Sequence, residues 1–360
     1  MDRGSELKKV TIKDIAREAG VSVATVSRVL SVEEDGPIGI SEKTAEKIRA
    51  IARRLGYVKS HAASRLKKKD SLRILGVIFA STLKDVASHV FFLELIWEIE
   101  KRAWERGYAL VPLHRGNFES KDAANGISRE GRSELEVMKN RILSVGASSL
   151  ISMGALTEAH FDLFDRMLIP FVVYEQYPVY ENVRSVYIDY RKSMEELIVR
   201  ICGKYRRFFF LSLPFDNIEH TPFRIRYQMF REYLVKSGCP SPQLLTVDLP
   251  PGVSDQLVLS RAREVVSGAG FRKGDFVLAA YDILAVSVHQ FFRKTGFRLG
   301  EEVGLCGFDD LHWVKYLDPP VSTVRLPRDK IAVALLDLLD SARQGNHRKV
   351  EAELVVRSTF

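Results

Sequence analysis

The chain is poor in cysteine and histidine, the residues that build disulfide frameworks and many metal centres. Its 360 residues include three cysteines, Cys202, Cys239 and Cys306, which are far apart and lack the spacing of metal ligands. The eight histidines include no pair at metal-binding spacing. We therefore expect no metal site, no cofactor, and cysteines that stay reduced as small core or surface residues in the cytoplasm.

Long apolar runs and a secretion signal are also missing. The longest apolar runs, 74–80 and 208–215, are as short as buried strands and far from the length of a membrane span. The amino terminus, MDRGSELKK, has no apolar stretch that could direct secretion. Together these features predict a cytoplasmic protein that does not enter a membrane.

Sequence signals of the common catalytic classes are absent too. There is no Gly-x-Ser-x-Gly nucleophile motif. The glycines of GAGFRKG (268–274) follow a helical stretch and lack the Lys-Ser/Thr ending of a phosphate loop, so a turn is expected there. No catalytic residue is therefore assigned, and the chain is not expected to be an enzyme.

Positive charge is concentrated in the first fifth of the chain. Residues 1–70 hold 16 Lys/Arg and 10 Asp/Glu, a net charge of +6 out of the +8 of the whole chain. A basic end on a nearly neutral protein is typical of a nucleic-acid-binding module. A membrane-surface segment would also be basic, but the helices expected here lack the broad aromatic and leucine face that it needs.

The segment 11–30, TIKDIAREAGVSVATVSRVL, has the pattern of a helix-turn-helix. Thr11 and Asp14 form a capping-box-like pair at the start of a first helix, and Gly20 suits the left-handed residue that ends it. Ser22 is a ready cap for a second helix. An ordinary helical hairpin is commoner among proteins at large, but the tight turn and the local charge favour DNA binding.

The second helix, 22–30, is the expected DNA-reading element, and a third helix from Ser41 to near Tyr57 closes the small core. Small and hydroxylated side chains at the start of the second helix allow its N-terminus to approach base edges and phosphates. Its inward positions are Val26, Val29 and Leu30. Its outward positions are Val23, Ala24, Thr25, Ser27 and Arg28.

A linker over residues 59–71 follows the third helix and ends in a lysine run. Ser60 can cap a short helix through Leu66, which is too short to be stable alone. In the free protein such a segment is a solvated tether. On DNA, the lysines at 67–69 can pair with phosphates, and Leu66 can act as an apolar wedge in the minor groove.

Beyond residue 72, apolar runs alternate with helical stretches. This alternation predicts an α/β fold, with helices covering both faces of parallel sheets, and the remaining chain is long enough for two such sheets. A ligand is then expected at the carboxyl ends of the strands, in the crevice between the sheets. The expected strands are 73–80, 148–153, 170–174, 207–213, 276–281 and 303–307. The expected helices are 91–107, 133–145, 191–205, 223–237, 254–268, 282–296 and 327–343.

The order of these segments resembles the lactose-repressor (LacI/GalR) family of transcription regulators. The stretch VTIKDIAREAGVSVATVSRVL (10–30) is the most diagnostic part. The likeness spans nearly the whole chain. It continues through SEKTAEKIRAIARRLGY (41–57), ILGVIF (74–79), FFLELIWEIEKRAWERGY (91–108), YDILAVSVHQFFRKTGFRLGEEVGLCGFDD (281–310), PPVSTVR (319–325) and LVVRST (354–359).

The resemblance implies a helix-turn-helix DNA-binding domain over 1–58, a hinge helix over 59–71, and an effector-binding and dimerisation core over 72–360. The core would resemble periplasmic sugar-binding proteins, with two discontinuous subdomains and chain crossings near 189–192 and 322–326. The family binds near-palindromic double-stranded DNA as a homodimer, because a two-fold protein matches a two-fold sequence.

The resemblance also implies which residues contact DNA and which contact a small-molecule effector. Val23 and Ala24 would meet thymine methyl groups in the major groove, and Arg28 would donate to guanine or phosphate. Leu66 matches the hinge leucine that wedges into the operator centre. The predicted DNA-binding residues are Thr11, Ser22, Val23, Ala24, Thr25, Ser27, Arg28, Ser60, Ala63 and Leu66. The predicted effector-binding residues are Phe91, Phe92, Glu175, Arg226 and Asp282.

Each effector residue also has an ordinary structural alternative. Asp282 matches the family's ligand-binding acid, yet it could simply cap a helix. Arg226 matches the ligand-binding arginine, yet an isolated arginine usually forms a surface ion pair. Glu175 aligns with an acidic residue of the site but is one methylene longer than the common Asp. Phe91 and Phe92 can stack on a sugar ring or fill the core.

The sequence departs from the family's pattern at four places near these functions. The connection SVEEDGPIGI (31–40) is longer and more acidic than usual. The hinge has Lys59-Ser60 where Pro-Asn is common, and Ser64-Arg65 where the reverse order is common. Tyr190 and Tyr281 stand where Asn is frequent. The first two departures bear on operator geometry, and the two tyrosines leave the identity of the effector open.

We therefore expect a ligand-controlled, sequence-specific repressor of carbohydrate-use genes, with a sugar as effector. A nucleobase or phosphorylated metabolite acting as corepressor is an alternative on the same fold, because Arg226 and the aromatic positions also suit a flat or anionic ligand. Two alternatives come from other classes: a sugar-processing enzyme fused to a DNA-binding headpiece, and a purely architectural DNA-binding protein.

The wedge role of the hinge leucine generates a first prediction. Replacing Leu66 with Ala is expected to weaken operator binding far more than binding to non-specific DNA, because a wedge acts only where the hinge is folded into the minor groove. Fluorescence anisotropy on an operator and on a scrambled duplex measures both affinities. Equal losses on the two duplexes would contradict the wedge role.

Overall fold

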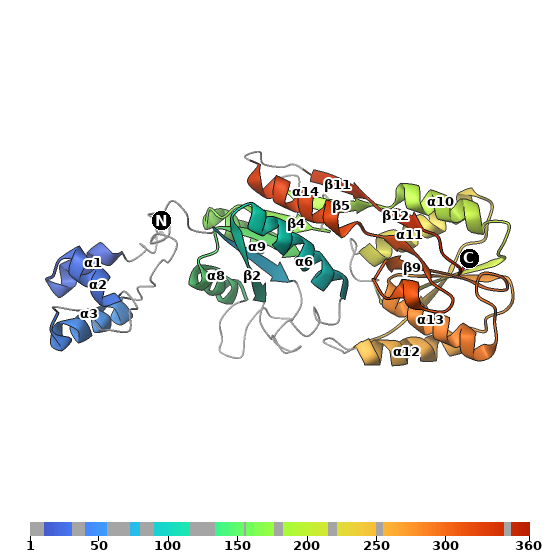
Figure 1. The fold of residues 1–360 in the computed structure, drawn as a ribbon, viewed down its shortest axis with the longest axis horizontal. Coiled ribbons are helices and arrows are strands. Elements are labelled where there is room, and N and C mark those ends of the chain that lie inside the picture. The colour runs from blue at the N-terminus through green and yellow to red at the C-terminus, as the bar shows by residue number, and fades with distance from the viewer. Residues whose placement is uncertain are drawn as a thin grey trace, which may run out of the picture. The chain divides into compact units, whose positions relative to one another are not determined.

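The computed structural model describes most of the chain, as two compact units. The units comprise Met1–Lys69 and Asp70–Phe360, and their elements are drawn in Figure 1. The described residues are 11–30, 40–55, 73–79, 90–114, 134–154, 156–175, 183–214, 222–249, 255–341 and 347–360. The predicted hinge residues Ser60, Ala63 and Leu66, and all but the last residue of the 31–40 connection, lie outside them.

Three helices build the first unit around a small apolar core. Ile15, Val26 and Ile48, one from each helix, are fully buried and form this core with the alanines of α1 and α3. The helices are α1 (Ile12–Ala19), α2 (Val23–Leu30) and α3 (Glu42–Arg54). The three-helix arrangement confirms the predicted helix-turn-helix and its third helix.

The helix ends carry the predicted caps. The Thr11 backbone N–H donates to the Asp14 carboxylate at 2.9 Å, completing the capping pair of α1. Gly20 ends α1 with a φ of 70°, in the left-handed region that a glycine adopts without strain. Ser22 Oγ accepts a hydrogen bond from the Thr25 backbone N–H at 3.1 Å at the start of α2.

Two six-stranded sheets build the second unit, which confirms the predicted α/β fold with parallel sheets. The first sheet has the order β11-β5-β4-β3-β1-β2 and is parallel throughout. The second has the order β12-β10-β9-β8-β6-β7, and only β12 runs antiparallel to its neighbour. The first contains β1 (Arg73–Phe79), β2 (Tyr108–His114), β3 (Ser149–Met153), β4 (Phe171–Tyr174), β5 (Ser185–Asp189) and β11 (His347–Glu351). The second contains β6 (Arg207–Ser212), β7 (Gln243–Thr246), β8 (Asp275–Ala279), β9 (Gly304–Asp309), β10 (Ser322–Arg325) and β12 (Glu353–Val355).

Helices cover the two sheets and define two subdomains (Figure 1). The first sheet carries α6 (Val90–Glu105), α8 (Glu134–Val145), α9 (Glu158–Arg166) and α14 (Arg328–Asp340). The second carries α10 (Arg191–Ile201), α11 (Pro222–Lys236), α12 (Asp255–Gly268), α13 (Asp282–Thr295) and the short turn η1 (Val314–Tyr316). Among the described residues, no helix combines the length and the apolar character that crossing a membrane requires.

The chain passes between the subdomains three times. It leaves the first sheet after β5, returns between β10 and β11, and crosses again between Glu351 and Glu353. The resemblance of the sequence to the family predicts crossings near 189–192 and 322–326. The third crossing depends on β12, which is three residues long and too short for a recognisable pattern.

Two cysteines correct an expectation. The structure joins Cys202 to Cys239 in a disulfide, with Cα atoms 6.4 Å apart, whereas all three cysteines were expected to be unpaired. Cys202 ends α10 and Cys239 follows α11, and these two helices pack against each other. A separation of 37 residues in sequence conceals this proximity. Cys306 is free and buried.

The left-handed glycine of the helix-turn-helix generates a second prediction. Replacing Gly20 with Ala is expected to destabilise the first unit by about 1–2 kcal/mol, because a Cβ is strained at this φ. Amide hydrogen exchange at Ile15 and Ile48, both in the first unit, measures the effect. Gly268→Ala is the matched control: Gly268 ends α12 with no left-handed φ and nothing within 4 Å of an added Cβ, so it should cost nothing. Unchanged exchange in the Gly20 variant would refute the strain argument.

Candidate functional site

The outward face of α2 is small, hydroxylated and exposed. The Val23 side chain is 42% exposed, and Ala24, Ser27 and Arg28 are also exposed, whereas Val26 and Val29 are buried. Thr25 is half-buried, and its hydroxyl is 2.8 Å from that of Ser22. This division of the helix agrees with the sequence analysis. The contacts of these residues and of Thr11 with bases and phosphates stay predictions.

A buried arginine stands at the centre of the second unit. Arg226, on α11, is 3% exposed. Its Nη1 donates to the Ala280 carbonyl at 2.6 Å, and its Nη2 and Nε donate to the Tyr190 hydroxyl at 3.1 and 3.3 Å. Two carboxylates flank it: Glu175 Oε1 lies 3.7 Å from Nη2, and Asp309 Oδ1 lies 4.0 Å from Nη1.

The groups around this arginine come from both subdomains. Glu175 directly follows β4 and Tyr190 directly follows β5, both in the first sheet. Asp309 ends β9 and Ala280 follows β8, both in the second sheet. Because all four positions are carboxyl ends of parallel strands, the cluster forms where ligands bind in open α/β sheets.

The cluster links the subdomains through one hydroxyl. The Tyr190 hydroxyl donates to Glu175 Oε1 at 2.9 Å while it accepts from Arg226. Glu175 and Tyr190 thus hold the arginine of the other subdomain. We call Glu175, Tyr190, Arg226 and Asp309 the interdomain cluster.

Burial and charge oppose each other in the interdomain cluster. Burial raises the pKa of Glu175 above its ordinary value, against the opposing effects of the Arg226 charge and the Tyr190 hydrogen bond. Burial likewise raises the pKa of Asp309, opposed by Arg226 and Arg328. Burial alone would lower the pKa of Arg226, but the surrounding oxygens outweigh it and the pKa is raised. The arginine is therefore a permanent cation whose charge the flanking carboxylates balance.

Aromatic rings enclose this site. The Arg226 guanidinium carbon lies 4.6 Å from the Phe308 ring centroid and 5.2 Å from that of Tyr190. Phe91, at the start of α6, is buried and stacks on Tyr174 with centroids 6.2 Å apart. Phe92 meets Phe91 edge to face at 5.6 Å and is only half-buried.

The backbone is left-handed at the acids of the site. Glu175, Asp309 and Asp310 have φ values of 56°, 101° and 53°, which side-chain-bearing residues rarely adopt. Strained backbone of this kind persists where the surroundings enforce it, and it is concentrated at functional sites. Leu168, in the turn after α9, is the one other such residue within the described ranges.

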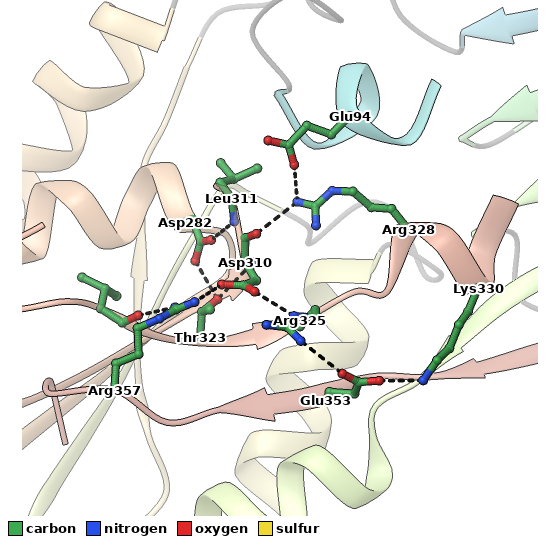
Figure 2. Close-up of polar contacts among 11 residues, drawn as sticks. Glu94, Asp282, Asp310, Leu311, Thr323, Arg325, Arg328, Lys330, Glu353 and Arg357 are labelled. Carbon is green, nitrogen blue, oxygen red and sulfur yellow. Dashed lines mark hydrogen bonds and ion pairs between the residues drawn. The ribbon is translucent and has the colours of Figure 1, made fainter. Parts of the chain in front are cut away.

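Asp282 has a different place from the other predicted effector residues. It is fully buried, and its two carboxylate oxygens accept hydrogen bonds from the Leu311 backbone N–H and the Thr323 hydroxyl, both at 2.8 Å (Figure 2). Burial and the neighbouring Asp309 raise its pKa well above the ordinary value. These contacts tie α13 to the segment after β9, so the structure gives Asp282 the role of supporting the loop that carries Asp309.

Asp310 fixes the same loop from its other side. Its carboxylate accepts hydrogen bonds from Arg325 at 2.8 Å and from Arg357 at 2.5 Å (Figure 2). Burial alone would raise the pKa of Asp310, but these two arginines outweigh it and the pKa is lowered. Arg325 ends β10, where the chain crosses between subdomains, so the loop at the site is fastened to the crossing strand.

The loop also contacts the first subdomain directly. Glu94, on α6, accepts from His312 Nδ1 at 2.9 Å and pairs with Arg328 Nη2 at 2.8 Å. Arg328 begins α14, lies 5.0 Å over the Phe91 ring and reaches the Asp310 carbonyl at 3.4 Å (Figure 2). Glu94 therefore joins the two subdomains in addition to the contacts of Arg226.

The structure thus brings Glu175 and Arg226 together, with Phe91 and Phe92 nearby, whereas Asp282 is hydrogen-bonded to Leu311 and Thr323. Sequence reasoning missed Tyr190 and Asp309 as members of the cluster. Both directly end or follow a strand, which is the signal that could have found them. Within the described ranges, no group of three or more His, Cys, Asp and Glu side chains is arranged to hold a metal ion.

The support role of Asp282 generates a third prediction. Replacing it with Ala is expected to lower the free energy of unfolding by about 2–4 kcal/mol, because two buried donors lose their acceptor. Urea denaturation measures this loss. Folding raises the pKa of Asp282, so its contribution to the free energy of unfolding falls as the pH rises from the ordinary pKa of 3.8 to the raised one. The stability deficit of Asp282→Ala should therefore shrink above pH 3.8.

Asp162→Ala provides the control for that measurement. Asp162 is an exposed residue of α9, and its loss should change the unfolding free energy by no more than about 0.5 kcal/mol. If Asp282→Ala were as stable as this control, the support role would be excluded.

Comparison with known proteins identifies both units. Residues 11–60 match the family described as bacterial regulatory proteins, lacI family, and residues 202–360 match the periplasmic binding protein-like domain. The ribose operon repressor of Escherichia coli is 25% identical over 338 residues, covering 91% of this chain and 92% of that protein. The transcriptional repressor PurR of Vibrio parahaemolyticus is 23% identical over 363 residues, covering 97% and 98%.

Solved structures share the fold over nearly the whole chain. A complex of the transcriptional regulator CelR with cellobiose has a TM-score of 0.62 at 20% identity, covering 98% of this chain and 100% of that chain. The lac repressor dimer bound to operator and the anti-inducer ONPF has a TM-score of 0.61 at 20% identity, covering 98% and 99%. LacI-family repressors are transcription regulators and not enzymes. This chain belongs to that family: it is a DNA-binding transcription regulator with a periplasmic-binding-protein-like effector domain.

Proposed function

We propose that this regulator is a homodimeric repressor that binds a near-palindromic operator, and that an uncharged carbohydrate bound at the interdomain cluster controls its affinity for DNA. The observation that carries the choice of effector is the charge balance around Arg226. Relatives that are named for ribose, and the CelR complex with cellobiose, support a sugar. The dimer is supported by the lac repressor, which was solved as a dimer on operator DNA.

The balanced charge argues against an anionic effector. The Arg226 cation lies between Glu175 and Asp309, and its Nη1, Nη2 and Nε all donate hydrogen bonds within the protein. A phosphate at this site would be repelled by the two carboxylates. Arg226 could not offset this repulsion without giving up hydrogen bonds that it makes within the protein. A sugar hydroxyl, by contrast, can donate to a carboxylate and accept from a guanidinium without adding charge.

Two hydroxyls at the site also suit a polyhydroxyl ligand. The Tyr174 hydroxyl at the end of β4 and Ser212 Oγ at the end of β6 are buried, with no hydrogen-bond partner within the described part of the chain. Buried polar atoms normally have partners. Hydroxyls of a sugar would supply them, while Phe91 offers an aromatic face for its ring.

Subdomain closure is the proposed link from effector to operator. The effector takes over bonds that Tyr190 and Glu175 make to Arg226, so the contacts between the two subdomains change with occupancy. Asp310 and Arg325 connect the loop at the site to the crossing strand, and Glu94 connects it to α6. A change in closure alters the spacing of the two hinges of the dimer, and thereby hinge folding and operator affinity.

A purine corepressor is the alternative on the same fold. It is favoured by the 23% identity to PurR and by the Phe91–Tyr174 stack, which could accept a flat base. The charge balance does not exclude it, because a nucleobase is also uncharged. Only ligand binding distinguishes the two.

The experiment is a thermal-shift comparison of four ligands, namely ribose, cellobiose, ribose 5-phosphate and adenine. A bound ligand at a hundred times its dissociation constant adds about 2.7 kcal/mol of stability, which is visible as a shift of several degrees. We expect a shift with a neutral sugar and none with the phosphate. Stabilisation by ribose 5-phosphate would contradict the charge argument, and stabilisation by adenine alone would establish the purine alternative.

Two variants locate the ligand. Glu175→Gln keeps an acceptor for Tyr190 but removes one charge, so the shift with a neutral sugar should fall, while any anion should bind better. Glu301→Gln is the matched control, because Glu301 is an exposed acid before β9, at the opposite edge of the sheet. Equal shifts in both variants would place the ligand elsewhere.

A further inference from the structure

A disulfide connects two neighbouring helices of the second subdomain. Cys202 ends α10 and Cys239 lies shortly after the end of α11, and the two sulfurs are bonded. Helices α10 and α11 pack side by side (Figure 1). Both cysteines are half-buried, so small thiols and disulfides in solution can reach them. The disulfide thus fixes one end of a helix pair and is open to exchange.

The other ends of the same two helices meet at the interdomain cluster. Tyr190 is the residue directly before α10, and Arg226 lies near the start of α11. The Tyr190 hydroxyl accepts hydrogen bonds from Nη2 and Nε of Arg226 at 3.1 and 3.3 Å. Hydrogen bonds therefore join the two helices at their starts, and the disulfide joins them at their ends. A change at the cysteines acts on the helix pair that positions Tyr190 and Arg226.

The subdomain has a large core that does not depend on the disulfide. Helix α10 buries Met194, Leu197 and Ile201, and α11 buries Phe230 and Leu234, all within one apolar cluster. A domain with a core of this size is stable without cross-links, unlike small secreted domains in which disulfides compensate for a small core. The reduced protein is therefore expected to stay folded, as a switch requires.

We propose that Cys202 and Cys239 form a reversible thiol–disulfide switch, in which oxidation fixes α10 against α11 and holds Tyr190 in contact with Arg226. A regulator that binds DNA works in a compartment whose thiol buffers keep most cysteines reduced. Disulfides that form there are usually transient, with catalytic or redox-sensing roles. The oxidant is a low-molecular-weight disulfide. The inference adds a second input to the effector site and does not depend on which effector binds.

Two exchange steps close the disulfide. The thiolate of one cysteine attacks a sulfur of the small disulfide, breaks its S–S bond and forms a mixed disulfide, which releases one small thiol. The thiolate of the other cysteine then attacks the protein sulfur of the mixed disulfide and releases the second small thiol. The cysteine pair loses two electrons and two protons, which the small disulfide gains as it becomes two thiols. The same steps in reverse reduce the pair.

The first test is a redox titration of the folded full-length chain in glutathione buffers of increasing disulfide fraction. Unfolding, alkylation and mass spectrometry then count the free thiols. We expect all three cysteines to be free in reducing buffers and Cys306 alone in oxidising ones, with full reversal. A structural disulfide resists the glutathione pool and would stay closed in every buffer, which would overturn the inference. Thiols that stay free in every buffer would overturn it as well.

Amide hydrogen exchange tests the effect on α10. The Cys202 N–H donates to the Ile198 carbonyl at the end of this helix, and the Met194 N–H donates to the Tyr190 carbonyl at its start, both at 2.9 Å. Reduction is expected to speed exchange at the Cys202 amide by about 10-fold, and at the Met194 amide by less, because the constraint acts from the end of the helix. Unchanged exchange at Met194 would confine the effect to the helix end and refute the link to Tyr190.

Two variants separate the disulfide from a general effect of the buffer. Cys202→Ser cannot close the bond, so its Met194 amide should exchange alike in both buffers and at the rate of the reduced wild type. Cys239→Ser removes the other sulfur and should behave in the same way, which guards against a folding defect in one variant. A difference between the buffers in both variants would assign the effect to another group. Because no effector is present, failure of this test leaves the proposed sugar site unaffected.

Discussion

The second unit depends on satisfying one buried cation. Arg226 is nearly inaccessible to water, so its charge must be matched inside the protein, and an unmatched charge there would be strongly destabilising. The matching groups come from strand ends of both sheets. The electrostatic contacts of the arginine therefore stabilise the relative position of the two subdomains.

The loop after β9 fixes the position of one carboxylate beside this arginine. Asp309 and Asp310 are adjacent and both left-handed, and their roles differ because they face opposite ways. Asp309 faces the buried arginine, and Asp310 faces Arg325 and Arg357. Asp282 accepts a hydrogen bond from the backbone N–H of Leu311, which follows Asp310. Asp310 thus connects the loop that carries Asp309 to the crossing strand β10.

The two units differ in how much of their structure is local. In the helix-turn-helix, caps and turns lie within three or four residues of one another, as in Thr11 with Asp14 and Ser22 with Thr25. In the second unit the decisive contacts join residues dozens or hundreds of positions apart, such as Glu94 with His312. Local contacts therefore determine the structure of the first unit, and long-range contacts determine that of the second.

The sequence by itself determined the parts whose cause is local or periodic. Helix caps, the left-handed glycine, the exposed face of α2 and the alternation of buried strands with helices follow from spacing along the chain. It failed where an element depends on its neighbours: β2 contains Pro112, which a strand tolerates at the sheet edge where β2 lies, and β12 exists only by pairing with β10. The alternation of strands and helices was therefore predictable, but six of the twelve described strands were not: the edge strands β2, β7, β11 and β12 and the interior strands β5 and β10.

The candidate site shows the same division. Glu175 and Arg226 could be named from the sequence, but only the tertiary structure decided that Tyr190 bridges them and that Asp309 completes the charge balance. The effector contact of Asp282 stays a prediction, and the fold adds two internal donors that the sequence did not indicate. The physical reason is that a side chain's role depends on which distant backbone groups surround it. That arrangement arises only when both sheets have formed and their strand ends meet.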